Sequence, residues 1–129
     1  MFTIDQIKSA HSKVKSGADY PSYVKDIIAL GVTGYESFVA DGHAVFFGNN
    51  NHQAIWEAKY SNMEIAGSSN KEQFVANLKA HQQGKTDYPT FCKDCARSGI
   101  EKWIVDLSKM TCAYYDKTGN EILVEIIPG

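Results

Sequence analysis

The residue spacing with the clearest chemical meaning is a pair of cysteines, Cys92 and Cys95, in a C-x-x-C pattern. Zinc sites and redox-active thiol pairs both use this spacing. A third cysteine, Cys112, follows, but no second Cys or His pair at zinc-finger spacing accompanies the first. We therefore favour packing of all three cysteines as small apolar residues in the core, with a metal or redox site at Cys92 and Cys95 as the weaker alternative. No cofactor is expected.

Two histidines offer acid–base chemistry near neutral pH. His11 and His81 each lie on the apolar stripe of an expected helix, and Asp26 and Asp94 in the following helices are candidate partners. A neighbouring carboxylate would hold one imidazole tautomer and favour the protonated ring. We predict a structural role for these His–Asp pairs, and a titrating functional site is the alternative.

Aromatic side chains are the third group with binding potential. Tyr20 and Tyr88 each precede a proline, where an exposed phenol can bind a ligand. We favour packing of these rings over a helix start. The ring pairs at 46–47 and 114–115 are adjacent, so in a strand one ring of each pair faces the core and the other the opposite side. With Trp56, the outward rings would form an apolar patch for a subunit contact or a ligand, unless the rest of the chain covers them.

The elements that must position these residues occur twice in the sequence. Residues 19–30 read DYPSYVKDIIAL, residues 87–98 read DYPTFCKDCARS, and a glycine follows each segment. The offset is 68 residues (87 − 19), and the ungapped match keeps proline and glycine, which both dictate backbone geometry. The same offset aligns Glu57 with Glu125, and a two-residue gap farther upstream aligns the two histidines. The sequence therefore predicts a tandem duplication.

The duplication divides one domain into two equivalent units. We expect a single domain over residues 1–129, with repeats at about 3–60 and 70–128 joined by a linker at 61–69. The three cysteines align with apolar residues of the first repeat, Val24, Ile27 and Ala44, which supports core packing. Three polar residues belong to the first repeat only, where a duplicated scaffold would specialise: Asp41, His43 and His52. We favour their role as turn residues, with a specialised site as the alternative.

Each repeat is predicted to contain two helices followed by a three-stranded antiparallel meander. Helix caps are expected at Thr3, which forms a capping box with Gln6, at Ser69 or Asn70, and at Asp19 and Asp87. Strands are expected at 35–40, 44–47 and 54–58, and again at 103–107, 110–115 and 121–127. Two such units give an α+β fold with helices against sheet and a pseudo-two-fold arrangement.

Composition narrows the classes of partner. The 129 residues carry 13 Lys and Arg against 15 Asp and Glu, for a net charge of −2. This balance argues against a nucleic-acid partner held by bulk charge. The opening residues contain no apolar run of the signal-peptide kind, and no segment approaches the ~18 apolar residues of a membrane span. Three cysteines do not form an even disulfide set. We expect a cytoplasmic protein without a membrane partner.

Three segments carry a resemblance to a known family: MFTIDQIKSAHSKVKSGADYPSYVKDIIALGVTGYESFVADGH, NKEQFVANLKAHQQGKTDYPTFCKDCARSGIEKWIVD and MTCAYYDKTGNEILVEIIP. Together they resemble the bacterial and prophage domain-of-unknown-function family 1398, whose members are often labelled phage envelope protein. The resemblance covers essentially the whole chain. It implies no catalytic residues that could be assigned here.

These observations favour a binding or assembly module, with a homodimer as the expected partner arrangement, over an enzyme. The alternative is a small-molecule enzyme or ligand sensor that uses a cleft between the two repeats. A phage structural or host-takeover protein is a third class, implied by the resemblance alone. The candidate binding residues are His11, Tyr20, Asp26, His43, Trp56, His81, Tyr88 and Asp94.

Overall fold

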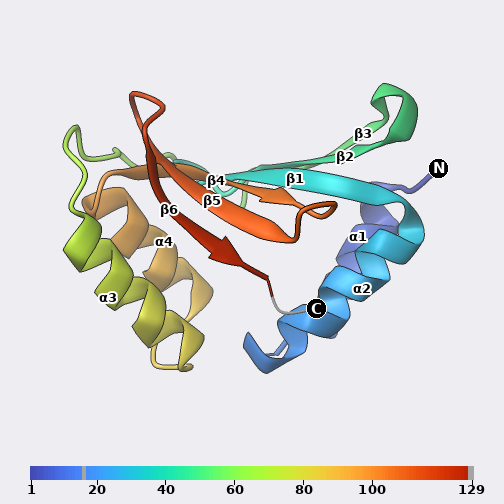
Figure 1. Cartoon of the computed structure of the whole chain (residues 1–129), viewed down its shortest axis with the longest axis horizontal. Coiled ribbons are helices and arrows are strands. Elements are labelled where there is room, and N and C mark those ends of the chain that lie inside the picture. Colours follow the sequence, from blue (N-terminus) through green and yellow to red (C-terminus); the bar gives the residue numbers. More distant parts are fainter. Residues whose placement is uncertain (16, 128–129) are drawn as a thin grey trace.

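The chain folds into two layers, a six-stranded sheet and two helix pairs that both pack below it on the same face (Figure 1). The computed structural model describes residues 1–15 and 17–127. The first repeat contains α1 (Ile4–His11), α2 (Tyr20–Leu30), β1 (Val32–Phe38), β2 (Ala44–Gly48) and β3 (Gln53–Trp56). The second contains α3 (Lys71–Gln82), α4 (Tyr88–Arg97), β4 (Ile100–Asp106), β5 (Thr111–Asp116) and β6 (Glu121–Ile126). The predicted α+β fold is confirmed, and it is consistent with a tandem duplication; residue 128 lies outside the described residues.

Side chains fix where three of the four helices start. The Thr3 hydroxyl accepts the backbone N–H of Gln6 while the Gln6 side chain accepts the Thr3 N–H, so the predicted capping box is present. Asn70 caps α3 by accepting the Gln73 N–H, and Asp87 caps α4 by accepting the Thr90 N–H. These bonds satisfy N–H groups that the first turn of a helix leaves without partners.

Asp19 is the N-cap residue of α2, as expected, but its side chain does not form the expected capping hydrogen bond. A short 3₁₀ turn, η1 (Gly17–Asp19), runs directly into α2, so the Asp19 backbone is already helical, with φ −88° and ψ −9°. Its side chain turns back instead and accepts the backbone N–H of Lys15 at 2.9 Å. The two repeats therefore start their second helices differently, although both keep a proline in the first turn.

The two repeats share one sheet with strand order β3-β2-β1-β4-β5-β6, antiparallel throughout. They join where β1 pairs with β4, and Glu36 lies opposite Ile104 at the middle of that pairing. These two residues are 68 positions apart, so they occupy equivalent positions in the two repeats. A pseudo-two-fold axis that relates the repeats therefore passes between them. The symmetric backbone bonds from Val39 N–H to Glu101 and from Leu107 N–H to Thr33 flank it.

The pairing of the third strand with the second differs between the two repeats by one residue. Tyr35 opposite Phe46 corresponds to Trp103 opposite Tyr114, as the offset requires. At the edge strands, however, Ala44 lies opposite Trp56 whereas Cys112 lies opposite Glu125, because a bulge between β5 and β6 takes up an extra residue. Trp56 is thus the structural counterpart of Glu125, and the ungapped alignment of Glu57 with Glu125 is wrong.

The core lies between the sheet and the helices. Phe46 and Tyr114 point inward and are buried, whereas their neighbours Phe47 and Tyr115 stay partly exposed, which confirms the expected division of the ring pairs. All three cysteines are buried at positions equivalent to apolar residues of the first repeat. Within the described residues, none of the helices has the length and apolar run that crossing a membrane requires.

The segment that follows β3 is fixed by backbone hydrogen bonds to both repeats. The Lys59 N–H donates to the Asp41 carbonyl at 2.8 Å, and the Met63 N–H donates to the Ala40 carbonyl at 2.7 Å. Farther along, the Ala66 N–H donates to the Ala96 carbonyl at the end of α4. This segment therefore holds its side chains at the junction between the first hairpin and the second helix pair.

Candidate functional site

A group of cations and aromatic rings surrounds Trp56 at the end of β3. The Lys59 ammonium lies 4.4 Å from the centre of the Trp56 ring and 5.6 Å from that of Tyr88. The Lys8 ammonium lies 5.6 Å from the Trp56 ring, and the His11 ring meets it edge to face at 5.2 Å. We call Lys8, His11, Trp56, Lys59 and Tyr88 the Trp56 cluster.

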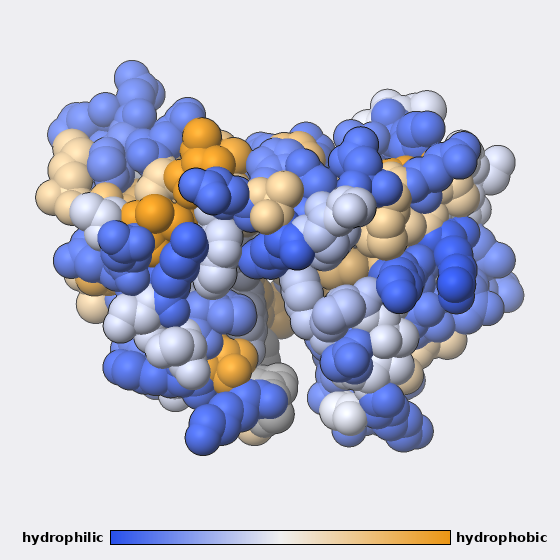
Figure 2. Space-filling model, turned by 180° about the vertical axis from the view of Figure 1, so that it is seen from behind, coloured by the Kyte–Doolittle hydropathy of each residue, from blue (hydrophilic) through white to orange (hydrophobic). Residues whose placement is uncertain are grey.

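Elements of both repeats position the cluster. Lys8 and His11 are three residues apart on α1, so they project from the same side of the helix. Trp56 lies opposite the buried Ala44 and therefore faces the helix layer. Tyr88 is the first residue of α4, in the other helix pair. Seen from behind, the two helix pairs form separate lobes with a hollow between them (Figure 2). The cluster thus spans the junction of the repeats.

The cluster carries positive charge. Burial against the rings lowers the pKa of Lys59, and the Lys8 ammonium lowers it further, while Cys92 opposes the shift. Burial and the nearby Lys59 also lower the pKa of His11 below 6.5, so this ring is neutral at pH 7. In the part of the chain that the structure describes, neither lysine forms an ion pair with a carboxylate. Two ammonium groups therefore face aromatic surface without a neutralising partner.

The carboxylate partner predicted for His11 is absent. No hydrogen bond joins His11 to Asp26 within residues 1–15 and 17–127, and the ring instead contacts Tyr23 and Trp56 edge to face, each at 5.2 Å. A carboxylate would have raised the pKa of His11, whereas burial and Lys59 lower it. Helical periodicity identified the face of each helix correctly, but it does not determine which residue of the partner helix lies opposite.

The contribution of His11 to folding stability should decrease as pH falls. A histidine paired with a carboxylate would instead contribute more stability at low pH. Because its pKa in the folded state lies below the unfolded value of 6.5, the unfolded state binds the proton more readily. The stability due to neutral His11 is present above about pH 6.5 and is lost as pH falls. His11→Gln should therefore lose less stability than the wild type between about pH 7 and pH 5. Urea unfolding across this range measures the difference, and a steeper loss in the variant would contradict it.

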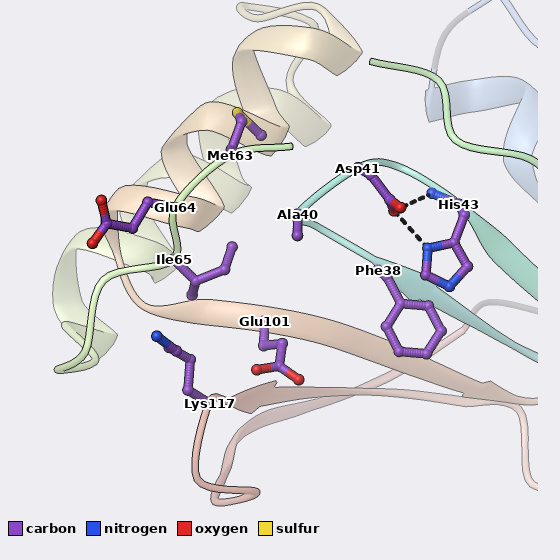
Figure 3. Close-up of a pocket in the computed structure, with 9 residues that line it drawn as sticks. All are labelled: Phe38, Ala40, Asp41, His43, Met63, Glu64, Ile65, Glu101 and Lys117. Atoms are coloured by element: carbon purple, nitrogen blue, oxygen red, sulfur yellow. Dashed lines mark hydrogen bonds and ion pairs between the residues drawn. The ribbon is translucent and has the colours of Figure 1, made fainter. Parts of the chain in front are cut away.

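A second arrangement involves residues of the first repeat only. His43 Nδ1 and the Asp41 carboxylate lie 2.5 Å apart, and the His43 N–H also donates to that carboxylate (Figure 3). Partial desolvation raises the pKa of Asp41, but the bonds from His43 outweigh it and leave the pKa lowered. The His43 ring stacks on Phe38 at 4.3 Å beside an open depression of about 350 Å³. Asp41 and His43 thus shape the hairpin turn, as expected of turn residues.

Comparison with known proteins identifies the family. Residues 8–126 match the family described as protein of unknown function (DUF1398). The chain belongs to this family. The matched range includes most of both repeats and every residue of the Trp56 cluster. A search of curated proteins gives no match.

The second histidine of this DUF1398 protein has a structural role without its expected partner. His81 Nδ1 lies 3.1 Å from the Thr86 carbonyl, and its ring stacks on Phe91 at 4.5 Å. No hydrogen bond from His81 to Asp94 occurs in the described ranges, so that pairing is also wrong. The contact of His81 with Phe91 corresponds to that of His11 with Tyr23, which supports the two-residue gap in the repeat alignment.

The two tyrosines before proline differ in accessibility. The Tyr20 hydroxyl lies 2.6 Å from that of Tyr35, and burial raises the pKa of Tyr20 to about 12 although this hydrogen bond opposes the shift. Tyr88 keeps 37% of its surface exposed. Only Tyr88 is therefore both near Trp56 and open to a ligand, while Tyr20 belongs to the packing between α2 and β1.

The cysteines of this DUF1398 protein lie in its core. All three are free and buried, and burial raises the pKa of each, to about 12 for Cys112. Raised pKa values keep thiols protonated, which suppresses both nucleophilic attack and metal binding. Among the residues described, no group of three or more His, Cys, Asp and Glu is arranged to hold a metal ion.

The structure separates some candidates and adds others. His52 lies away from the cluster, with Nε2 2.7 Å from the Phe2 carbonyl, and His43 faces the depression near Phe38. Lys8 and Lys59, which supply the charge, were not predicted from the sequence. A lysine in a helix and a lysine just after a strand carry no local signal of a site, because only the fold brings them to Trp56.

Proposed function

We propose that this DUF1398 protein is a binding module for a small organic anion that carries an aromatic or apolar group, with the Trp56 cluster as its site. The observation that supports this most directly is the position of two ammonium groups, from Lys8 and Lys59, beside the Trp56 ring, where neither has an ion-pair partner among residues 1–15 and 17–127. Both repeats contribute residues, as expected for a ligand sensor between the repeats.

Charge gives the site its preference for anions. The pKa of Lys59 is lowered mainly by burial and in smaller part by repulsion from the Lys8 ammonium, and a bound anion would replace this repulsion by attraction. A charge-assisted hydrogen bond to an anion contributes about 1.5–3 kcal/mol. The faces of Trp56 and Tyr88 would contact the apolar part of the same ligand. Neutral molecules and cations should bind more weakly.

The arrangement supports binding rather than bond-making chemistry. Cys92, which borders the cluster through Lys59, has a raised pKa and is protonated at neutral pH. The pKa of Tyr88 is raised as well, so neither group supplies an activated nucleophile. The cytoplasmic location and the phage-envelope label stay predictions, since neither follows from the fold or from this cluster.

Phenyl phosphate is a suitable probe because it combines an aromatic ring with an anionic group. Trp56 and Trp103 are the two tryptophans, so Trp103→Phe leaves Trp56 as the single tryptophan, whose fluorescence can be excited selectively over that of tyrosine. Titration with phenyl phosphate should change this fluorescence saturably, inorganic phosphate should bind more weakly, and added salt should weaken both. Calorimetric titration of the wild type checks that the substitution itself has no influence.

Two variants with the same change in net charge test the position of the site. Lys59→Gln should weaken phenyl phosphate binding about tenfold or more, whereas Lys25→Gln on the exposed face of α2 should leave it unchanged. Equal weakening by both substitutions would indicate a nonspecific charge effect. That result, or the absence of saturable binding, would overturn the proposal.

A further inference from the structure

The edge formed by β6 has the features of a strand that requires a partner. Within the described residues, β6 pairs with β5 alone, so one side of its backbone presents unpaired N–H and C=O groups. Val124 and Ile126 project from it with 45% and 82% of their surface exposed. The strand reads EILVEI and contains no lysine, arginine or proline, which proteins commonly place on exposed edges to prevent pairing.

The opposite edge of the same sheet is different. Strand β3 has four residues against six in β6, and the 3₁₀ turn η2 (Asn49–Asn51) precedes it. Asn50 and Asn51 in that turn adopt positive φ, which bends the chain away from a straight edge. Short, bent edges offer few backbone groups to another strand. The two edges of the sheet are therefore unequal, although the repeats are related by a pseudo-two-fold axis.

We infer that β6 is an interface with a second copy of this chain, in which two β6 strands pair antiparallel and continue the sheet from one copy into the other. The backbone groups along β6 would then find partners, and Val124 would be covered. This surface lies on the second repeat and is independent of the Trp56 cluster.

The charges on β6 select the register of such a pair. If both copies keep their helices on the same side of the joined sheet, each residue lies opposite one whose side chain points to the same face. The bulge lies between Glu121 and Leu123, so the regular stretch that can pair runs from residue 123 to 126 and centres on Glu125 or on Val124. Centring on Glu125 would place the two Glu125 carboxylates directly opposite each other, and like charges directly opposite destabilise a sheet. Centring on Val124 places Leu123 opposite Glu125 of the second copy and Val124 opposite Val124 of the second copy. The strand is thus self-complementary in this second register.

The first experiment measures the mass of the full chain in solution and the effect of a lysine at the centre of the interface. The wild type should be a dimer by analytical ultracentrifugation. Val124→Lys places two like charges opposite each other and should give a monomer that unfolds at nearly the same temperature, because the side chain is already half exposed. Ile55→Lys, at an exposed isoleucine of β3, is the matched control and should remain a dimer.

The second experiment detects the contact directly. Val124→Cys should form a disulfide-linked dimer under mild oxidation, because directly opposed residues of an antiparallel pair have the Cα separation that a disulfide requires. Ile55→Cys and the wild type, whose cysteines are buried, should not. A monomeric wild type would overturn the inference. So would a dimer that Ile55→Lys dissociates and Val124→Lys does not.

Discussion

Lys59→Glu should reduce affinity for phenyl phosphate by on the order of a hundredfold. The substitution removes a charge-assisted contact of about 1.5–3 kcal/mol and adds repulsion between a carboxylate and the anion, and each 1.4 kcal/mol corresponds to tenfold in affinity. The new carboxylate would also pair with the Lys8 ammonium, which shares the Trp56 ring with Lys59. Isothermal titration calorimetry measures the loss.

Two control variants define how specific this loss should be. Lys25→Glu changes net charge equally from an exposed position on α2 and should have little effect. Lys8→Gln should weaken binding less than Lys59→Gln, because the Lys8 ammonium lies farther from the Trp56 ring, at 5.6 Å against 4.4 Å. The reverse order of these two lysines would contradict the assigned geometry.

Phe74→Ala should lower the free energy of unfolding by about 3–5 kcal/mol, the cost of removing a buried phenylalanine ring. Phe74 is fully buried on α3 and contacts the Tyr114 ring at 4.9 Å, so it ties this helix to β5. Urea unfolding followed by circular dichroism measures the loss. The neighbouring Val75 is 36% exposed, and Val75→Ala should cost much less. Similar losses for both variants would show that α3 does not pack through Phe74.

The repeat explains why so much of the fold could be predicted. A match that keeps Asp, Pro and Gly in register indicates that one folding unit occurs twice, and the spacing of apolar residues identifies its helices and strands. The joining of the repeats through β1 and β4 could not be predicted, because strand periodicity shows which face is buried but not which strand lies alongside. The one-residue shift at β6 also escaped prediction, since a bulge leaves no signature in the alignment.

The candidate site was predicted only in part. His11, Trp56 and Tyr88 were singled out individually, but nothing in the sequence indicated that Lys59 brings Trp56 and Tyr88 together. The predicted His–Asp pairs failed for a related reason. A contact between two helices depends on their relative rotation and offset, which local spacing does not determine.

Among the described residues, the second repeat does not reproduce the Trp56 cluster. At the position equivalent to Trp56, the second repeat has Glu125, whose carboxylate accepts hydrogen bonds from Tyr114 at 3.3 Å and from Gln82 at 3.2 Å. That carboxylate disfavours an anion. The proposed ligand should therefore bind with a stoichiometry of one per chain, at the first repeat's edge of the sheet.

The central claim is that a small organic anion binds at Trp56, and nuclear magnetic resonance of the Trp103→Phe variant tests it most directly. With one tryptophan left, the indole N–H signal belongs to Trp56 without ambiguity. Addition of phenyl phosphate should shift this signal together with backbone amides of α1 and of the start of α4. Shifts confined to the depression beside Phe38 and His43, or a Trp56 signal that does not move, would contradict the account.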